Sequence, residues 1–197
     1  MKLDFGSPRR LSLPIHQQTE FVLVRPHYPE NLGAAARALK AMGFMRLAVV
    51  RPGRLCTPEH EMAFKMAVKS WDVLDRAQRY DSVTEAVQGA HCVVATTARR
   101  GHSRIQTPRE LTPQLLRHAA AGQHITILFG NEKTGLDEDE MKPCNAPMRI
   151  PMAASQPSIN LAQAVQLVAY ELLIQALDAQ DSSAGAGNGE AAPPSEE

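Results

Sequence analysis

Residues 151–165, PMAASQPSINLAQAV, join an irregular loop bounded by prolines directly to the start of a long apolar helix. The first turn of a helix leaves backbone N–H groups without intrahelical partners, so Ser158 and Asn160 are well placed to cap it. Two other segments carry polar residues where an expected strand meets a helix or a loop: NLGAAAR at positions 31–37 and FGNEKTGL at positions 129–136. We call the three junctions corners. Packing does not require those polar residues, so the three corners together predict one composite site.

Short apolar runs alternate with amphipathic segments between residues 20 and 177. Strands that are apolar throughout and separated by helices are typical of a parallel sheet covered on both faces. The sequence therefore predicts an α/β fold, with a mostly parallel sheet and helices on both faces. We expect strands at 21–24, 47–50, 92–95, 125–129 and 148–150, and helices at 31–42, 59–69, 82–88, 113–121 and 161–177.

The two ends of the chain differ in composition from its middle. Residues 1–18 are predicted to form a flexible arm, 19–179 a single domain and 180–197 a disordered, acidic, low-complexity tail. Residues 178–197 hold five of the 21 acidic residues and no base, which leaves 21 bases against 16 acids in residues 1–177. A mildly basic body is compatible with nucleic-acid binding but does not require it.

Composition argues against several classes of protein. The three cysteines are scattered and the seven histidines form no HExxH motif, so we expect neither a disulfide framework nor a metal site. No apolar run is long enough to span a bilayer, and the N-terminus lacks the apolar region of a signal peptide. We therefore expect a cytoplasmic protein without a membrane partner.

The glycine pair at 130 and 135 has the spacing of a phosphate-binding loop. The next residues are Leu136 and Asp137 instead of lysine and a hydroxyl residue, which argues against a nucleoside triphosphatase. No GxGxxG motif follows a predicted strand, so the dinucleotide fingerprint is absent too. A loop at the carboxyl end of a strand is still a common ligand site in open α/β sheets, and an ordinary glycine turn is the alternative.

Several basic and small residues have two interpretations each. Arg37 lies in the middle of a predicted helix on its polar side, where most arginines are simply solvated. Gly33 costs up to about 1 kcal/mol relative to alanine in a helix, so it requires a reason such as close packing. Arg99 and Arg100 follow the strand that ends near Thr96, and they form either a solvated loop or a phosphate-facing rim.

In order and spacing, the three corners resemble the motifs of the SpoU/TrmH-type RNA 2'-O-ribose methyltransferases of the SPOUT superfamily. The first motif corresponds to residues 31–43, the second to 128–136, and the third to 150–152 together with 158–165. TTAR at 96–99 and AYE at 169–171 resemble the TrmJ-like branch most closely. Each motif alone is weak, whereas three in the same order are strong.

The resemblance implies a C-terminal trefoil knot that holds S-adenosylmethionine, and a homodimer in which the partner completes each site. It also implies metal-free 2'-O-methylation of RNA, with tRNA as the expected substrate. Ribosomal RNA is the alternative substrate within the family. An inactive RNA-binding SPOUT protein and an unrelated α/β ligand-binding domain are the alternatives outside this enzyme class.

The resemblance also assigns roles to particular residues. The implied catalytic residues are Arg37, Asn31, Glu132, Ser158 and Asn160. The implied cofactor-binding residues are Thr96, Leu128, Gly130, Ile150, Met152, Ser158 and Leu161, and the implied RNA-binding residues are Arg37, Arg99 and Arg100. One departure concerns Asn131, because TrmJ-like proteins often carry an arginine at this point of the second motif.

Overall fold

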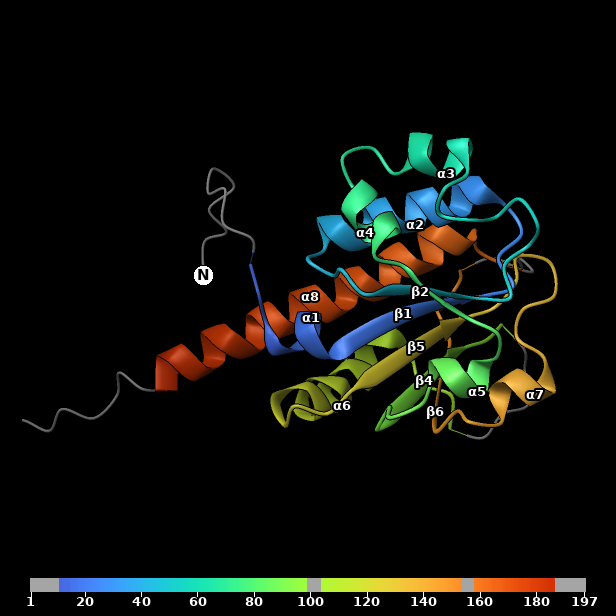
Figure 1. Cartoon of the computed structure of the whole chain (residues 1–197). Helices are drawn as coiled ribbons and strands as arrows, with labels where there is room; N and C mark the ends of the chain where they lie inside the picture. The colour runs from blue at the N-terminus through green and yellow to red at the C-terminus, as the bar shows by residue number, and fades with distance from the viewer. Residues whose placement is uncertain (1–10, 99–103, 154–157, 187–197) are drawn as a thin grey trace, which may run out of the picture.

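The structure is a computed structural model that describes residues 11–98, 104–153 and 158–186. One sheet organises it, and every pair of neighbouring strands is parallel. Its strands are β1 (Thr19–Val24), β2 (Leu47–Val50), β3 (Gln78–Tyr80), β4 (Cys92–Thr96), β5 (Ile125–Phe129) and β6 (Ala146–Met148). They lie in the order β3-β2-β1-β5-β4-β6, so β1 and β5 are central (Figure 1).

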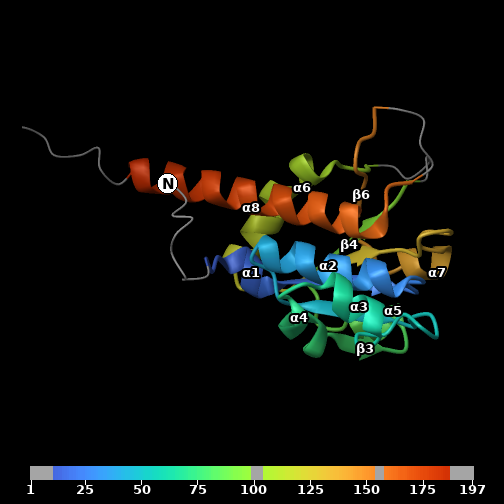
Figure 2. The ribbon, with the colours of Figure 1, turned by 90° about the horizontal axis from the view of Figure 1, so that it is seen from above.

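Helices cover both faces of this sheet, as predicted. They are α1 (Pro14–Gln18), α2 (Pro29–Ala41), α3 (Glu61–Met66), α4 (Trp71–Asp75), α5 (Val83–Ala86), α6 (Pro108–Ala120), α7 (Glu138–Met141) and α8 (Leu161–Ala186). The larger core cluster joins one face of the sheet to α2, α6 and α8, and a smaller cluster joins the other face to α5 and α7. Helices α2 and α8 pack side by side, and α3 packs on α2 (Figures 1 and 2).

Most predicted strands are confirmed. Their residues are mainly apolar because the strands are buried on both sides. Strands β1 and β2 are buried along their whole length. The last strand lies at 146–148 instead of 148–150. Strand β3 was not predicted, because it is polar and largely exposed at the edge of the sheet.

Helix α6 begins five residues before its predicted start at Pro113. Thr107 and Glu110 form a reciprocal capping box that fixes the earlier start. Pro113 cannot donate a hydrogen bond to the carbonyl of Arg109, but Nε2 of Gln175 on α8 donates to that oxygen at 3.1 Å. A contact between helices therefore replaces the missing helical hydrogen bond.

Helix packing explains why Gly33 is placed in the first turns of α2. A Cβ at this position would lie 2.0 Å from the carbonyl oxygen of Ala63 in α3. Only glycine allows the two helices to approach so closely. The expectation that Gly33 serves close packing is confirmed.

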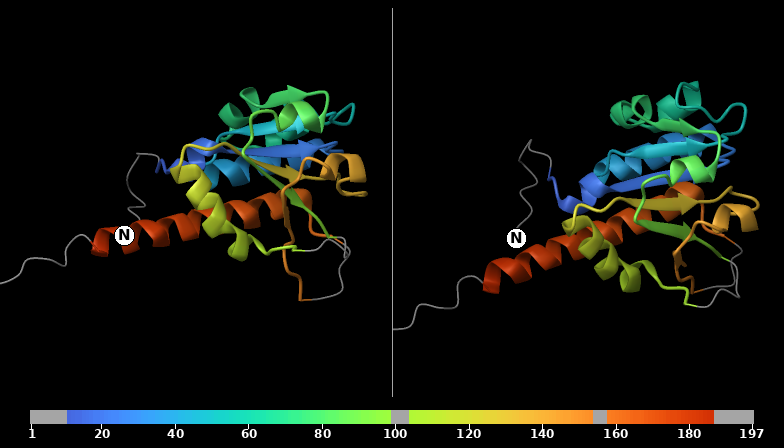
Figure 3. Two further views of the ribbon diagram at one scale, coloured as in Figure 1. Left: turned by 90° about the horizontal axis from the view of Figure 1, so that it is seen from below. Right: turned by 60° about the horizontal axis from the view of Figure 1, so that its bottom comes forward.

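The two ends differ from the predicted arm and tail. Helix α1 lies within the predicted arm, but Leu13 and Ile15 are buried in the core and the His16 ring packs edge-on against Phe44. At the other end, α8 continues to Ala186, past the predicted end at 177 and into the range assigned to the tail (Figure 3). Residues 1–10 and 187–197 lie outside the described residues.

The parallel arrangement brings several loops to one edge of the sheet. The carboxyl ends of β1, β4 and β5 lead into residues 25–28, 97–98 and 130–137, and residues 149–153 follow β6. These loops supply most of the predicted site. The trefoil knot that the resemblance implies stays a prediction.

Candidate active site

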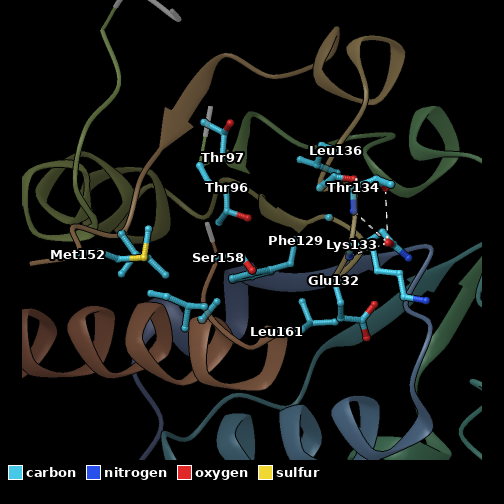
Figure 4. Close-up of a pocket in the computed structure, with 17 residues that line it drawn as sticks. Thr96, Thr97, Phe129, Glu132, Lys133, Thr134, Leu136, Met152, Ser158 and Leu161 are labelled. Carbon is cyan, nitrogen blue, oxygen red and sulfur yellow. Dashed lines mark hydrogen bonds between the residues drawn. The ribbon is translucent and has the colours of Figure 1, made fainter. Parts of the chain in front are cut away.

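A cavity of about 350 Å³ lies at the carboxyl edge of the sheet (Figure 4). It lies between the ends of β4 and β5, the segment after β6, and the start of α8. Its lining includes six of the seven predicted cofactor-binding residues: Thr96, Gly130, Ile150, Met152, Ser158 and Leu161. The seventh, Leu128, is buried in β5, and its carbonyl oxygen accepts a hydrogen bond from Thr96 Oγ1 at 2.9 Å.

Glu132 connects the second predicted motif to the first. Its carboxylate accepts hydrogen bonds from Asn31 Nδ2 at 2.8 Å and from the backbone N–H groups of His27 at 3.0 Å and Tyr28 at 3.3 Å. Tyr28 is the N-cap residue of α2 and has no side-chain cap of its own. The negative charge therefore lies at a helix N-terminus, where unpaired N–H groups and the helix dipole favour it.

Asn160 connects the third motif to the same group. Its Nδ2 donates to Asn31 Oδ1 at 2.9 Å, while its own Oδ1 accepts from the backbone N–H groups of Ala162 at 3.0 Å and Gln163 at 3.3 Å. Asn160 thus caps α8 and contacts α2 at once. Glu132, Asn31 and Asn160 form a continuous hydrogen-bonded chain across three segments that are distant in sequence, and we call it the polar chain.

Arg37 lies outside the first cavity. It is exposed and lines a second cavity of about 590 Å³ between α2 and α8, together with Asn160, Met66 and Leu167. Its guanidinium has no hydrogen-bond or ion-pair partner within the described residues. The composite site is therefore divided into two cavities, and Ile159 lines both of them.

The loop after β5 has a tightly closed shape that accounts for its glycines. A Cβ on Gly130 would lie 2.3 Å from the backbone of Gly135, which itself has a φ of 68°. Asn131 Oδ1 accepts from the backbone N–H of Lys133 at 2.9 Å, and Asn131 Nδ2 donates to the carbonyl of Arg25 at 2.6 Å. The close approach at Gly130 is thus to the loop's own backbone.

Several lining residues were missed by sequence reasoning. Thr97, Phe129, Lys133, Thr134 and Leu136 line the first cavity. Their position directly after β4, or at the end of β5 and beyond, was the available signal, because ligands bind beyond the carboxyl ends of parallel strands. The predicted RNA-binding residues Arg99 and Arg100 lie outside the described residues.

The buried thiols are not candidates for a nucleophile. Burial, with smaller contributions from the charges of Glu132 and Glu30, raises the pKa of the Cys56 thiol to about 12. Burial, with a smaller contribution from Cys144, raises the pKa of Cys92 to about 11. Both thiols are therefore protonated near neutral pH, and only a thiolate is a strong nucleophile.

In the three described ranges, no group of three or more histidine, cysteine or acidic side chains is arranged to hold a metal ion. No helix there combines the length and apolar character needed to cross a bilayer.

Comparisons with known proteins point to one family. The model of the SpoU rRNA Methylase family matches residues 18–170. The tRNA (cytidine/uridine-2'-O-)-methyltransferase TrmJ of Klebsiella pneumoniae is 37% identical over 90% of this chain and 72% of its own length. The tRNA (cytidine/uridine/adenosine-2'-O-)-methyltransferase TrmJ of Pseudomonas aeruginosa is 37% identical over 81% of this chain and 62% of its own length.

A solved structure gives the same result at the level of the fold. The putative methylase family protein from Neisseria gonorrhoeae superimposes with a TM-score of 0.77 and 35% identity, covering 84% of this chain and 85% of that one. The chain spans about two thirds of the length of the curated relatives it matches. Family model, relatives and structure agree, and this chain belongs to the SpoU rRNA Methylase family.

Proposed function

We propose that this chain is an S-adenosylmethionine-dependent 2'-O-ribose methyltransferase that acts on tRNA. The main support is the polar chain, which runs from Glu132 in the first cavity through Asn31 to Asn160, and Asn160 lines the second cavity together with the exposed Arg37. The two TrmJ relatives carry names that specify tRNA, which favours tRNA over ribosomal RNA. A tRNA substrate is also consistent with a cytoplasmic protein.

The first cavity suits the cofactor in size and chemistry. Its volume of about 350 Å³ falls within the range of small-molecule pockets, about 300–1,000 Å³. Apolar side chains, among them Ile150, Met152 and Leu161, can pack on an adenine ring, while the backbone after β5 provides polar groups. Bound S-adenosylmethionine would supply a methyl group on a positively charged sulfur.

Arg37 is the residue that we assign to the substrate. Its free guanidinium can bind the phosphate next to the target ribose and stabilise the negative charge that develops on the 2'-oxygen. Arginine stays protonated under ordinary conditions, so it is not the general base. A substrate phosphate or a water molecule would accept the hydroxyl proton.

The polar chain would hold the parts of this site in place. Asn31 is buried, and its amide contacts Glu132 on one side and Asn160 on the other. Because α2 carries both Asn31 and Arg37, the polar chain fixes the helix that presents the guanidinium. Ser158 is exposed at the cavity wall and is available to a ligand. We further propose that Arg99 and Arg100 contact RNA phosphates.

A homodimer is the assembly we propose. The second cavity combines Arg37 with apolar residues, of which Met66 is 38% and Leu167 is 45% exposed, and Tyr170 lies one turn beyond Leu167 on α8. A second copy covering this face would bury these side chains and bring a second site close to Arg37. Sedimentation velocity tests the assembly, because a species of one chain's mass at micromolar concentration would contradict it.

The activity is tested in two stages. Calorimetry with S-adenosylmethionine is expected to show binding, whereas its absence would favour an RNA-binding protein without catalysis. Methyl transfer from labelled cofactor is then compared between unmodified tRNA and ribosomal RNA, and the position of the label is mapped. Label on a tRNA ribose is expected; label on ribosomal RNA alone, or on a base, would overturn the proposal.

A further inference from the structure

An ion-pair cluster around one buried carboxylate lies next to the loop at residues 130–137, and no part of the proposed reaction uses it. The carboxylate of Glu140 on α7 is 3% exposed. It accepts hydrogen bonds from Arg25 Nε at 2.6 Å and Nη2 at 2.8 Å, from Arg51 Nη2 at 2.9 Å, and from the backbone N–H of Asp137 at 2.9 Å. A buried carboxylate requires such pairing, and this one is fully engaged.

The backbone at both arginines is unusual. Arg25 follows β1 directly with a φ of 51°, and Arg51 follows β2 directly with a φ of 43°. Residues other than glycine rarely adopt this left-handed conformation, and it persists only where surrounding contacts stabilise it. The shared carboxylate of Glu140 supplies such a contact for both residues.

Arg25 also holds the loop at residues 130–137 at two points. Its Nη2 donates to the carbonyl of Gly135 at 3.1 Å, and its Nη1 donates to Thr134 Oγ1 at 3.4 Å. At the other end of the loop, the backbone carbonyl of Arg25 accepts from Asn131 Nδ2 at 2.6 Å. One residue therefore contacts both ends of the loop, and Glu140 orients its guanidinium.

Residues 130–136 of this loop line the first cavity without interruption. We propose that Arg25 and Glu140 are positioning residues for cofactor binding, which set the shape of the loop 130–137 against the end of β1. This inference rests on the proposed function, because it assigns the first cavity to S-adenosylmethionine. It also gives Asn131 a structural role in place of the charge that an arginine would bring to that position.

The test compares this pair with a matched pair at the opposite end of the same two strands. Arg46, just before β2, lies 4.0 Å from the carboxylate of Glu20 in β1 and is remote from both cavities. The variants are Arg25→Ala, the nearly isosteric Glu140→Gln, and Arg46→Ala as the control. Each full-length protein is titrated calorimetrically with S-adenosylmethionine, and hydrogen exchange of residues 130–137 is followed without cofactor.

Cofactor affinity is expected to fall about tenfold in Arg25→Ala and less in Glu140→Gln, because contacts to a charged group are lost. Hydrogen exchange in the loop is expected to accelerate in both variants. The Michaelis constant for the cofactor should rise, whereas kcat at saturating cofactor and the Michaelis constant for RNA should stay near wild-type values. Arg46→Ala should match the wild type in all of these measurements.

Two results would overturn the inference alone. One is wild-type cofactor affinity in both variants, and the other is an equal loss of cofactor and RNA binding that tracks a lowered melting temperature, as a purely structural role predicts. If the wild-type protein binds no S-adenosylmethionine, the proposed function fails and this inference fails with it. Failure of the proposed function is therefore seen in the wild-type protein, whereas failure of this inference alone is seen only in the comparison of the variants with the wild type.

Discussion

Asn31 of the polar chain and Arg37 of the second cavity lie on the same helix, α2, yet their hydrogen bonding differs completely. Asn31 is 9% exposed, and both ends of its amide are engaged within one chain. Arg37, further along the same helix, is exposed and has no partner within the described residues. A hydrogen-bonded group can position its neighbours, whereas an exposed charge is available to a ligand, and this difference underlies the proposed supporting role of Asn31 and substrate-binding role of Arg37.

The largest effect is expected from removing the free charge. Arg37→Ala should lower kcat about 10²–10³-fold, the typical cost of losing a group that stabilises developing charge. Calorimetric affinity for S-adenosylmethionine should not change, because Arg37 lies outside the first cavity. Arg37→Lys serves as the comparison, since it keeps a charge without the planar fork. Wild-type turnover in Arg37→Ala would refute the assignment.

The second-largest effect is expected in the polar chain, at Glu132. Glu132→Ala removes the acceptor of three N–H donors. The free energy of unfolding should decrease by about 1–3 kcal/mol, because the buried Asn31 amide would lose its acceptor, while the exposed N–H groups of His27 and Tyr28 can turn to water. Urea denaturation measures the change, and Glu132→Gln should lose less because it keeps one acceptor oxygen. If both variants are as stable as the wild type, the polar chain is not a support.

A third change disturbs the packing beside the second cavity without removing a polar side chain. Gly33→Ala places a methyl group 2.0 Å from the carbonyl oxygen of Ala63, so α3 and its Met66 must shift. Overpacking of this kind costs about 1–3 kcal/mol, which thermal unfolding would detect. An unchanged melting temperature would show that α2 and α3 are not in contact at this point.

The pH dependence of stability tests the ion pairs of Glu140 with Arg25 and Arg51. Burial alone would raise the pKa of Glu140, but hydrogen bonds from Arg25 and the Asp137 N–H, with the charges of Arg25 and Arg51, hold it below the ordinary value of 4.5. A lowered pKa contributes stability at pH above the unfolded-state value, and this contribution is lost as pH falls through the folded-state value.

The free energy of unfolding should therefore decrease below about pH 4.5, and this decrease should be shallower in Glu140→Gln. Urea titrations at successive pH values measure both slopes. Identical slopes in the two proteins would mean that Glu140 titrates alike in the folded and unfolded states.

The smallest effect is expected at an exposed ion pair between α2 and α4. Lys40 Nζ lies 2.7 Å from Asp72, and both side chains are about 40% exposed. Lys40→Ala should change stability by only about 0–1 kcal/mol, because exposed pairs gain little over hydration. Methyl transfer should be unaffected, because Lys40 lines neither cavity. A clear loss of activity would extend the functional surface beyond the second cavity.

Sequence reasoning was most successful where local pattern and burial coincide. The apolar runs that became β1, β2, β4 and β5 were recognisable because strands buried on both faces are dominated by apolar residues, although Thr19, Glu20 and Thr126 are buried there as well. The edge strand β3 and the short helix α7 had no such signal. The early start of α6 was missed because Pro113 looked like a helix start, whereas a side chain of α8 compensates for the missing hydrogen bond.

The sequence by itself determined the α/β architecture and the family, and it singled out six residues that line the first cavity, because motif order and strand ends are local properties of the chain. Only the tertiary structure decided how those residues connect. It linked Glu132 to Asn160 through Asn31, moved Arg37 into a separate cavity, and paired Arg25 with Glu140 across 115 positions. Hydrogen bonds and ion pairs depend on distances of a few ångströms between remote segments, and residue order does not encode those distances.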